Sequence, residues 1–262
     1  QSPVIESEPL MLKLRTLFAT ALLLTAPVLT SAPALAEPSF NLDVWQGAKV
    51  YYQPGFAFLD TGALNQSIAP SGYANYSGTF LSQGGGVQVI LDRIVIGGSG
   101  YSLNGFRTAS GKGDTLGVSS GYGLLNLGYV IFKEQNFSLY PILGIGSGSV
   151  RLSSSEALNK LFGFVSSSDV FDLQSSQVVL DLGLGADYLL DFNGDPNHAS
   201  GLLVGLKLGY VFVPSPPQWE SGGRPVGGSV PNLNAQGPYL SLSLGVGTQR
   251  EQQTSGEAQP FN

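Results

Sequence analysis

The chain has 262 residues, of which 36 are glycine, none is cysteine and 11% are charged, and its formal net charge is −6 at pH 7. A hydrophobic content of 42% argues against a disordered chain, and an acidic chain without a basic patch argues against a nucleic-acid partner. The absence of cysteine excludes disulfide scaffolds, thiolate metal sites and cysteine nucleophiles.

The N-terminal region has the pattern of a secretory signal peptide. Two basic residues follow Met11, the only methionine, and an apolar run then covers residues 17–28. An A-x-A cleavage motif ends at Ala36. The apolar run is too short for a membrane-spanning helix, which needs about 20 apolar residues. We therefore expect residues 1–10 to be an upstream extension and residues 11–36 to be a cleaved signal peptide.

The rest of the chain divides into about eight strand-like stretches separated by turn residues. No later stretch is long enough for a spanning helix, so any later membrane crossing must be made by strands. Pro54 interrupts the first stretch and implies a sheet edge or a bulge there. The connection after it could form one helical turn from Leu64 to Ile68. The expected strands are 49–60, 79–91, 94–108, 115–132, 137–152, 178–190, 202–212 and 238–247.

The alternation of side chains is clearest in the hairpin 177–213. Its even positions from 178 to 190 are apolar, whereas most odd positions between them are aspartate or glycine. The second arm alternates in the same way, with Lys207 between two glycines. Successive strand residues face opposite sides of a sheet, and here the polar side is small and suits a cramped interior. Apolar-out, polar-in alternation over segments of about 10 residues predicts a transmembrane β-barrel.

The lengths of the connections support this prediction. A secreted barrel keeps its N-terminus in the periplasm, so its first, third, fifth and seventh connections lie outside, where connections are long. Three of these four are long, namely 61–78, 153–174 and 214–236, whereas the other turns are short. The sequence therefore predicts an antiparallel up-and-down β-barrel with its long loops at the cell surface.

The signal peptide, the repeated Gly-x-Gly strands and motifs such as Tyr129-x-x-Phe132 and Leu206-x-Leu208-Gly209-Tyr210 resemble small bacterial outer-membrane barrels of the OmpA/OmpX-like class. The resemblance covers about residues 45–247, and we expect the barrel domain to be 37–247. It implies a monomer in the bacterial outer membrane, with membrane lipid and the barrel-assembly machinery as partners.

The C-terminus departs from that pattern. Such barrels commonly end on a strand with a terminal aromatic residue, which the assembly machinery recognises. Here the last expected strand stops near Gly247, and Phe261 lies far down the polar tail 248–262.

Three motifs could carry chemistry, and each has a plainer interpretation. Asp191, Asn193 and Asp195 have the spacing of calcium ligands, but Asn-Gly followed by Asp-Pro is also typical of a turn. Gly144-x-Gly146-x-Gly148 could suggest a phosphate loop, but no helix is expected after it, and inward glycines of a crowded barrel explain it. His198, the only histidine, falls in a short turn rather than beside the outer loops.

Inside the predicted barrel we expect a charge cluster of Asp181, Asp187 and Lys207. All three share the inward parity of adjacent strands. If the hairpin is symmetric, Lys207 lies opposite Gly183 or Gly185 and reaches one of the two aspartates diagonally. Leu182, Leu184, Leu206 and Leu208 should then face lipid, with Tyr188, Tyr210 and Phe212 nearer a membrane boundary.

The function that we expect is structural or surface-interacting, carried by the outer loops of a non-conducting barrel without a cofactor. One alternative is an outer-membrane lipid-modifying enzyme, whose single possible base would be His198. Another is a secreted, lipocalin-like barrel that binds a small apolar ligand.

Overall fold

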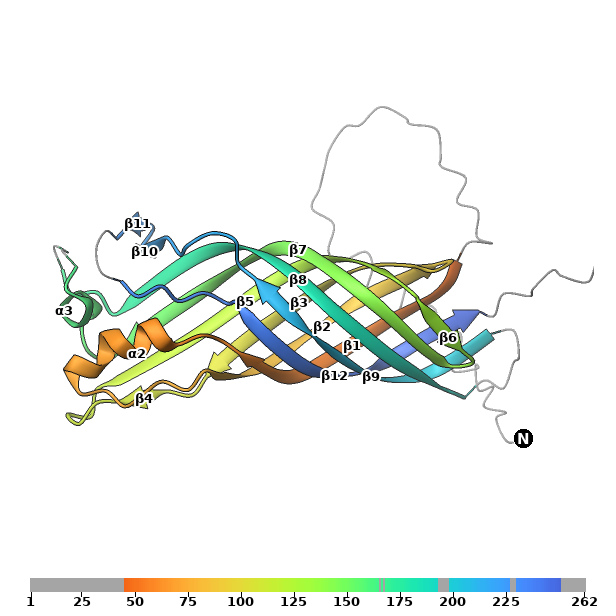
Figure 1. The fold of residues 1–262 in the computed structure, drawn as a ribbon, viewed down its shortest axis with the longest axis horizontal. Coiled ribbons are helices and arrows are strands. Elements are labelled where there is room, and N and C mark those ends of the chain that lie inside the picture. The colour runs from red at the N-terminus through yellow and green to blue at the C-terminus, as the bar shows by residue number, and fades with distance from the viewer. Residues whose placement is uncertain (1–44, 165, 167, 193–197, 227–229, 251–262) are drawn as a thin grey trace, which may run out of the picture. The chain divides into compact units, whose positions relative to one another are not determined.

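The computed structural model describes residues 45–164, 166, 168–192, 198–226 and 230–250, which lie in the second of two compact units, 41–262. Eight long antiparallel strands pair in the order β1–β2–β3–β5–β7–β8–β9–β12, and β12 pairs back with β1 to close a barrel (Figure 1). The predicted all-β, eight-stranded barrel is confirmed. The strands are β1 (Trp45–Phe58), β2 (Thr79–Leu91), β3 (Ile94–Gly105), β5 (Thr115–Tyr129), β7 (Phe137–Ser154), β8 (Asp172–Asp191), β9 (His198–Phe212) and β12 (Gly237–Arg250).

Several strand ends differ from the prediction. The expected strand 115–132 is divided into β5 and the short β6 (Phe132–Glu134), which folds back on β7. β8 begins earlier than expected, because its serine-rich start pairs with the outer half of β7. β12 continues past Gly247 to Arg250, since it stays paired with β9 along its whole length.

Pro54 causes neither a sheet edge nor a shift of register, so that expectation was wrong. The β1–β12 ladder pairs Tyr52 with Leu244 and Gly55 with Ser241, which is the same register on both sides of the proline. Proline lacks the N–H group that a ladder needs, and in a closed barrel the loss remains local.

The connections gather by length at the two ends of the barrel (Figure 1). The four longer connections lie at one end, which we call the long-loop end, and they contain the short helices of the described residues and three of the four short strands described. The opposite end, the turn end, carries the short connections and β6. The elements at the long-loop end are α2 (Gly62–Ile68), η2 (Ala69–Ser71), β4 (Thr108–Ala109), α3 (Leu158–Phe162), β10 (Trp219–Ser221) and β11 (Arg224–Pro225). Among the described residues, no helix is long and apolar enough to cross a membrane.

A belt of exposed, large apolar side chains covers the outside of the barrel. Leu182, at mid-strand, is 51% exposed, and the other leucines expected to face lipid are exposed as well. Monomers in water rarely expose so continuous an apolar surface. The members in the middle of the strands are Val50, Tyr52, Val87, Ile96, Leu125, Leu127, Leu143, Ile145, Leu180, Leu182, Leu184, Val204, Leu206, Leu208, Leu242 and Leu244.

The polarity of the two faces reverses toward the long-loop end. In the outer halves of β5, β7 and β8 the inward positions become apolar, as with Leu116, Leu152 and Leu173, which are fully buried. The outward positions there become polar or glycine, as with Ser149 and Gln174. The same strands therefore pass from a membrane pattern to a water-soluble pattern without a break in pairing.

Tyrosines occupy the interior because glycines on neighbouring strands make room for them. Tyr140 lies directly opposite Gly185 in the β7–β8 ladder, and a Cβ added at Gly185 would come within 2.5 Å of the tyrosine ring. The same arrangement recurs around the barrel. The other opposed pairs are Tyr51–Gly86, Tyr101–Gly84, Tyr122–Gly148 and Tyr239–Gly209.

We expect Gly185→Ala to destabilise the barrel by about 1–3 kcal/mol, because a new methyl group forces a rigid ring out of place. Gly98→Ala is the matched control, since a Cβ there would meet only the Leu124 carbonyl oxygen at 3.8 Å. Urea unfolding of both variants, refolded into lipid vesicles, measures the difference. Equal losses in the two variants would contradict the packing argument.

Candidate functional site

The interior of the barrel contains two buried lysine–aspartate pairs, each joined by a tyrosine. Lys207 Nζ lies 2.8 Å from Asp181 Oδ2, and the Tyr239 hydroxyl donates to the same oxygen over 3.2 Å. All three side chains come from the adjacent strands β8, β9 and β12. This arrangement neutralises the Asp181 carboxylate inside the barrel.

The second pair joins strands that are not neighbours in the sheet. Lys49 of β1 forms an ion pair with Asp187 of β8 across the interior. The Tyr140 hydroxyl donates to Asp187 Oδ2 over 2.8 Å and accepts from Lys49 Nζ over 2.7 Å. Lys49 Nζ also lies 4.3 Å from the centre of the Tyr140 ring, within the range of a cation–π contact.

The register of the strands explains which aspartate each lysine pairs with. Lys207 lies opposite Gly185, and its Cε passes 3.2 Å from the position that a Cβ at Gly183 would occupy. The side chain thus runs over the glycine to Asp181, while Asp187 is held by Lys49. Of the predicted cluster, the structure brings Lys207 and Asp181 into contact and gives Asp187 a different partner.

Lys49 was missed in the sequence analysis. β1 pairs with β2 and β12 only, so its contact with β8 arises from closure of the barrel rather than from a ladder. A usable signal did exist, because two inward aspartates require two cations and Lys49 has the inward parity of its own strand.

Neutral polar groups fill the interior beside the two ion pairs. Gln53 accepts from the Tyr101 hydroxyl and donates to Ser243 Oγ over 2.7 Å. Asn126 Nδ2 of β5 donates to Ser99 Oγ of β3 over 2.8 Å. These bonds connect strands on several sides of the barrel, so the middle of the interior is occupied by side chains rather than open.

An apolar core closes the long-loop end. Side chains from α2, α3 and the last long connection pack onto the inward apolar residues of the strands. Trp219 anchors that connection, since its indole N–H donates to the Pro231 carbonyl oxygen over 3.2 Å. The largest fully buried members of this core are Leu64, Ile68, Phe80, Leu103, Leu116, Leu152, Leu158, Leu173 and Leu233.

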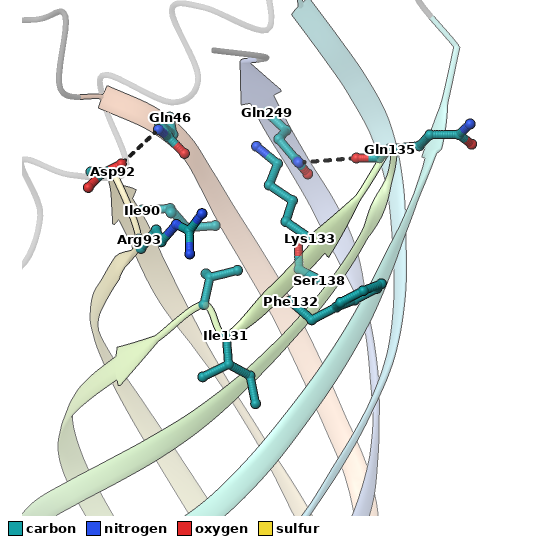
Figure 2. Close-up of a pocket in the computed structure, with 11 residues that line it drawn as sticks. Gln46, Ile90, Asp92, Arg93, Ile131, Phe132, Lys133, Gln135, Ser138 and Gln249 are labelled. Carbon is teal, nitrogen blue, oxygen red and sulfur yellow. Dashed lines mark hydrogen bonds between the residues drawn. The ribbon is translucent and has the colours of Figure 1, made fainter. Parts of the chain in front are cut away.

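The turn end carries a cavity of about 530 Å³ (Figure 2). Arg93 and Lys133 lie among its lining residues, and Gln46 donates to Asp92 at its rim. Beyond it, beside Lys49, a second cavity holds only about 20 Å³. The turn-end cavity is therefore a vestibule rather than a through-going channel.

The other residues singled out from the sequence have plain structural roles or cannot be placed. The strand interpretation of Gly144-x-Gly146-x-Gly148 is confirmed, because all three lie within β7. Asp191 Oδ1 accepts from the Ser200 backbone N–H over 2.8 Å. Asn193 and Asp195, its proposed partners in an ion site, lie outside the described residues. Within the described ranges, no group of three His, Cys, Asp or Glu side chains could hold a metal.

His198 is the first residue of β9 and pairs with Arg250 through the backbone at the turn end. A catalytic pair that uses this histidine would have to form at the turn end, on the opposite side from the long connections. The expectation that His198 lies away from the long connections is confirmed by this backbone position.

Strand closure, the exposed apolar belt and the polar interior together define a closed, eight-stranded up-and-down barrel of the transmembrane type. No family model matches the chain, and no curated protein matches its sequence. Solved structures do resemble it, and among them are small outer-membrane β-barrels.

Three of these neighbours illustrate the level of similarity. Ail, the attachment invasion locus protein of Yersinia pestis, is 13% identical with a TM-score of 0.42, over 77% of this chain and 98% of its own. Neisserial surface protein A is 14% identical with a TM-score of 0.33, over 79% and 96%. OprG from Pseudomonas aeruginosa is 12% identical with a TM-score of 0.38, over 80% and 99%. The barrel assignment of this chain rests on its own strand pairing.

We expect Lys207→Ala to destabilise the barrel, because removal of one partner of a buried ion pair costs about 3–5 kcal/mol, a figure that the polar interior reduces. Adding Asp181→Asn should restore part of the loss, whereas adding Asp187→Asn should not, since that carboxylate serves Lys49. Urea unfolding of the two double variants distinguishes these outcomes. Equal rescue by either substitution would contradict the pairing.

Proposed function

We propose that this protein is an integral barrel of the bacterial outer membrane that does not conduct and that presents its long-loop end as an interaction surface. The observation that carries the proposal is the exposed apolar belt around a barrel whose buried centre is charged and polar. In water this distribution would be reversed, whereas in a bilayer the belt contacts hydrocarbon and the closed strands satisfy their backbone groups.

The absence of conduction is supported by two barriers in series. The two ion pairs and their tyrosines occupy the middle of the interior, and an apolar core fills the long-loop end. Eight strands enclose a space that side chains can just fill. Movement of an ion would require a buried pair to break and an apolar core to open.

The proposed orientation follows from the expected signal peptide. An exported chain leaves its N-terminal side in the periplasm, which puts the long-loop end at the cell surface. There the short helices pack on the apolar core, with Leu64, Ile68 and Leu158 fully buried. The surface that they present is therefore a folded platform, which suits a structural or surface-interaction role.

A heat-modifiability gel on outer-membrane fractions tests the location and the fold together. We expect the full chain to appear in this fraction and to migrate faster unheated than boiled, because a folded membrane barrel stays compact in detergent. Recovery of the protein in the periplasm or the medium, without a mobility shift, would support a soluble lipocalin-like barrel instead.

The lipid-facing belt can be tested at one position. We expect Leu184→Arg to cost about 2–4 kcal/mol, which is the penalty for a cation at the bilayer midplane. Ser176→Arg is the matched control on the same strand, because Ser176 lies outside the belt toward the long-loop end. Unfolding from lipid vesicles provides the measurement. An equally large penalty for Ser176→Arg would contradict the assignment of the lipid-facing belt.

Whether the interior of the barrel blocks the passage of ions can be measured in planar bilayers. We expect the purified wild type to show no steady single-channel conductance, because both barriers lie in the path of an ion. Reproducible unit steps in current, carried by protein that still shows heat-modifiable migration, would refute the closed interior while leaving the membrane barrel intact.

A further inference from the structure

The turn-end cavity has the size and the lining of a small-molecule site. Its volume of about 530 Å³ falls within the range of about 300–1,000 Å³ that is usual for ligand pockets, which combine apolar walls with a few charged groups. Ile90, Val130 and Phe132 supply apolar surface, and Arg93 and Lys133 supply positive charge (Figure 2). The lining thus offers contacts to both parts of an amphipathic molecule.

Arg93 is the residue on which the charge preference of the cavity depends. It lies in the two-residue turn between β2 and β3, where Leu91 pairs with Ile94. Its backbone carbonyl oxygen accepts from the Val130 N–H over 2.7 Å, which ties this turn to the chain that leaves β5. Within the described part of the chain, its guanidinium forms no ion pair and no hydrogen bond. A guanidinium in this state can bind the oxygens of an external anion in a bidentate manner.

The other charged groups of the lining leave the cavity positive. Lys133 of β6 reaches it from a different connection, and its Nζ donates to the Arg250 carbonyl oxygen over 3.4 Å. Asp92 is the only carboxylate among the lining residues, and its Oδ1 accepts from Gln46 over 3.3 Å. Two cations and one carboxylate give the lining a formal charge of +1, in a chain whose formal net charge is −6. The local field therefore favours an anion.

The rim of the cavity contains the two non-glycine residues whose backbone is left-handed, as counted over the described residues. Asp92 has φ +54° and Gln135 has φ +48°, and both belong to the lining. A left-handed backbone costs a residue with a Cβ about 1–2 kcal/mol, a cost that glycine avoids. Strain of this kind concentrates at binding and active sites. Its occurrence in two separate turns around one cavity supports a binding role for that cavity.

The cavity lies within the mouth of the barrel, on the inward side of the strands. Ser138 of its lining is buried and pairs with the inward Asp187 in the β7–β8 ladder. Gln46 is buried where the β1–β2 ladder skips a residue. Val130 belongs to an apolar cluster inside the barrel, against which Ile90 packs. A ligand therefore reaches the cavity from the aqueous phase rather than from the bilayer.

We propose that the turn-end cavity binds a small amphipathic anion from the aqueous phase, either a carboxylate or a phosphate ester. Its anionic oxygens lie against the Arg93 guanidinium, and its apolar part lies on Ile90 and Val130. The site goes beyond the proposed function, which concerns the long-loop end. In the proposed orientation the cavity faces the periplasm, so its ligand is a periplasmic solute.

An NMR titration of the detergent-refolded full chain, with labelled isoleucine methyl groups and N-acetylphenylalanine as the probe, tests the site. We expect the Ile90 methyl signal to shift and to saturate. Arg93→Gln should weaken binding about tenfold, which corresponds to about 1.4 kcal/mol. Arg224→Gln is the matched control, because Arg224 is an exposed arginine of β11 at the opposite end. Equal weakening by the control would overturn the site.

Further probes separate charge, apolar contact and the source of the ligand. The neutral amide of N-acetylphenylalanine should bind about tenfold more weakly, whereas phenyl phosphate should bind and should depend on Arg93. Inorganic phosphate should bind more weakly than phenyl phosphate, because it lacks an apolar part. Equal binding of the amide, or equal binding of inorganic phosphate, would overturn the proposal.

A lipid headgroup is tested as the occupant in nanodiscs at physiological salt. We expect N-acetylphenylalanine to bind equally well in discs of phosphatidylcholine and of phosphatidylglycerol. Its displacement in phosphatidylglycerol would overturn the aqueous source. Each variant is first checked for heat-modifiable migration. Loss of that shift in the wild type counts against the membrane barrel, whereas an inserted wild type whose Ile90 signal does not respond to the probe counts against the cavity site alone.

Discussion

The narrowness of an eight-stranded barrel is the constraint on which the rest of this structure depends. The interior is only wide enough for side chains, so every inward group must fit in volume and be satisfied in charge. Glycine opposite tyrosine meets the first requirement, because the ring of Tyr140 occupies the space that Gly185 leaves. The Lys207–Asp181 and Lys49–Asp187 pairs meet the second. A high glycine content and a low charge content follow from the same constraint.

The change of polarity along the strands divides the molecule into two regimes. In the belt the strands are stabilised as in other membrane barrels, with apolar groups outside and a polar interior. Toward the long-loop end they pack like a soluble domain, with Leu152 and Leu173 inside and polar residues outside. The strands stay paired without interruption through both regions. The inward and outward positions keep their parity, but the inward residues change from polar to apolar and the outward residues change from apolar to polar.

The alternation of residues was sufficient to predict the barrel, its approximate strand count and the lipid-facing leucines, since a period of two is a local property. It also predicted that Lys207 points inward near an aspartate. The parity of Lys49 indicates that it points inward, but it does not identify Asp187 as its partner, because that contact spans the interior between strands that never pair.

The apolar core at the long-loop end has a consequence for how the protein is made. Its members come from three long connections and the outer halves of several strands, so their contacts join residues far apart in the sequence. Contacts of this kind form late in folding. In the proposed orientation they can form only after every long connection has crossed the bilayer. Once assembled, the packed core would hold the long connections together on the far side of the membrane. Withdrawal of one hairpin would expose its apolar residues to water, so this core should slow extraction more than it speeds insertion.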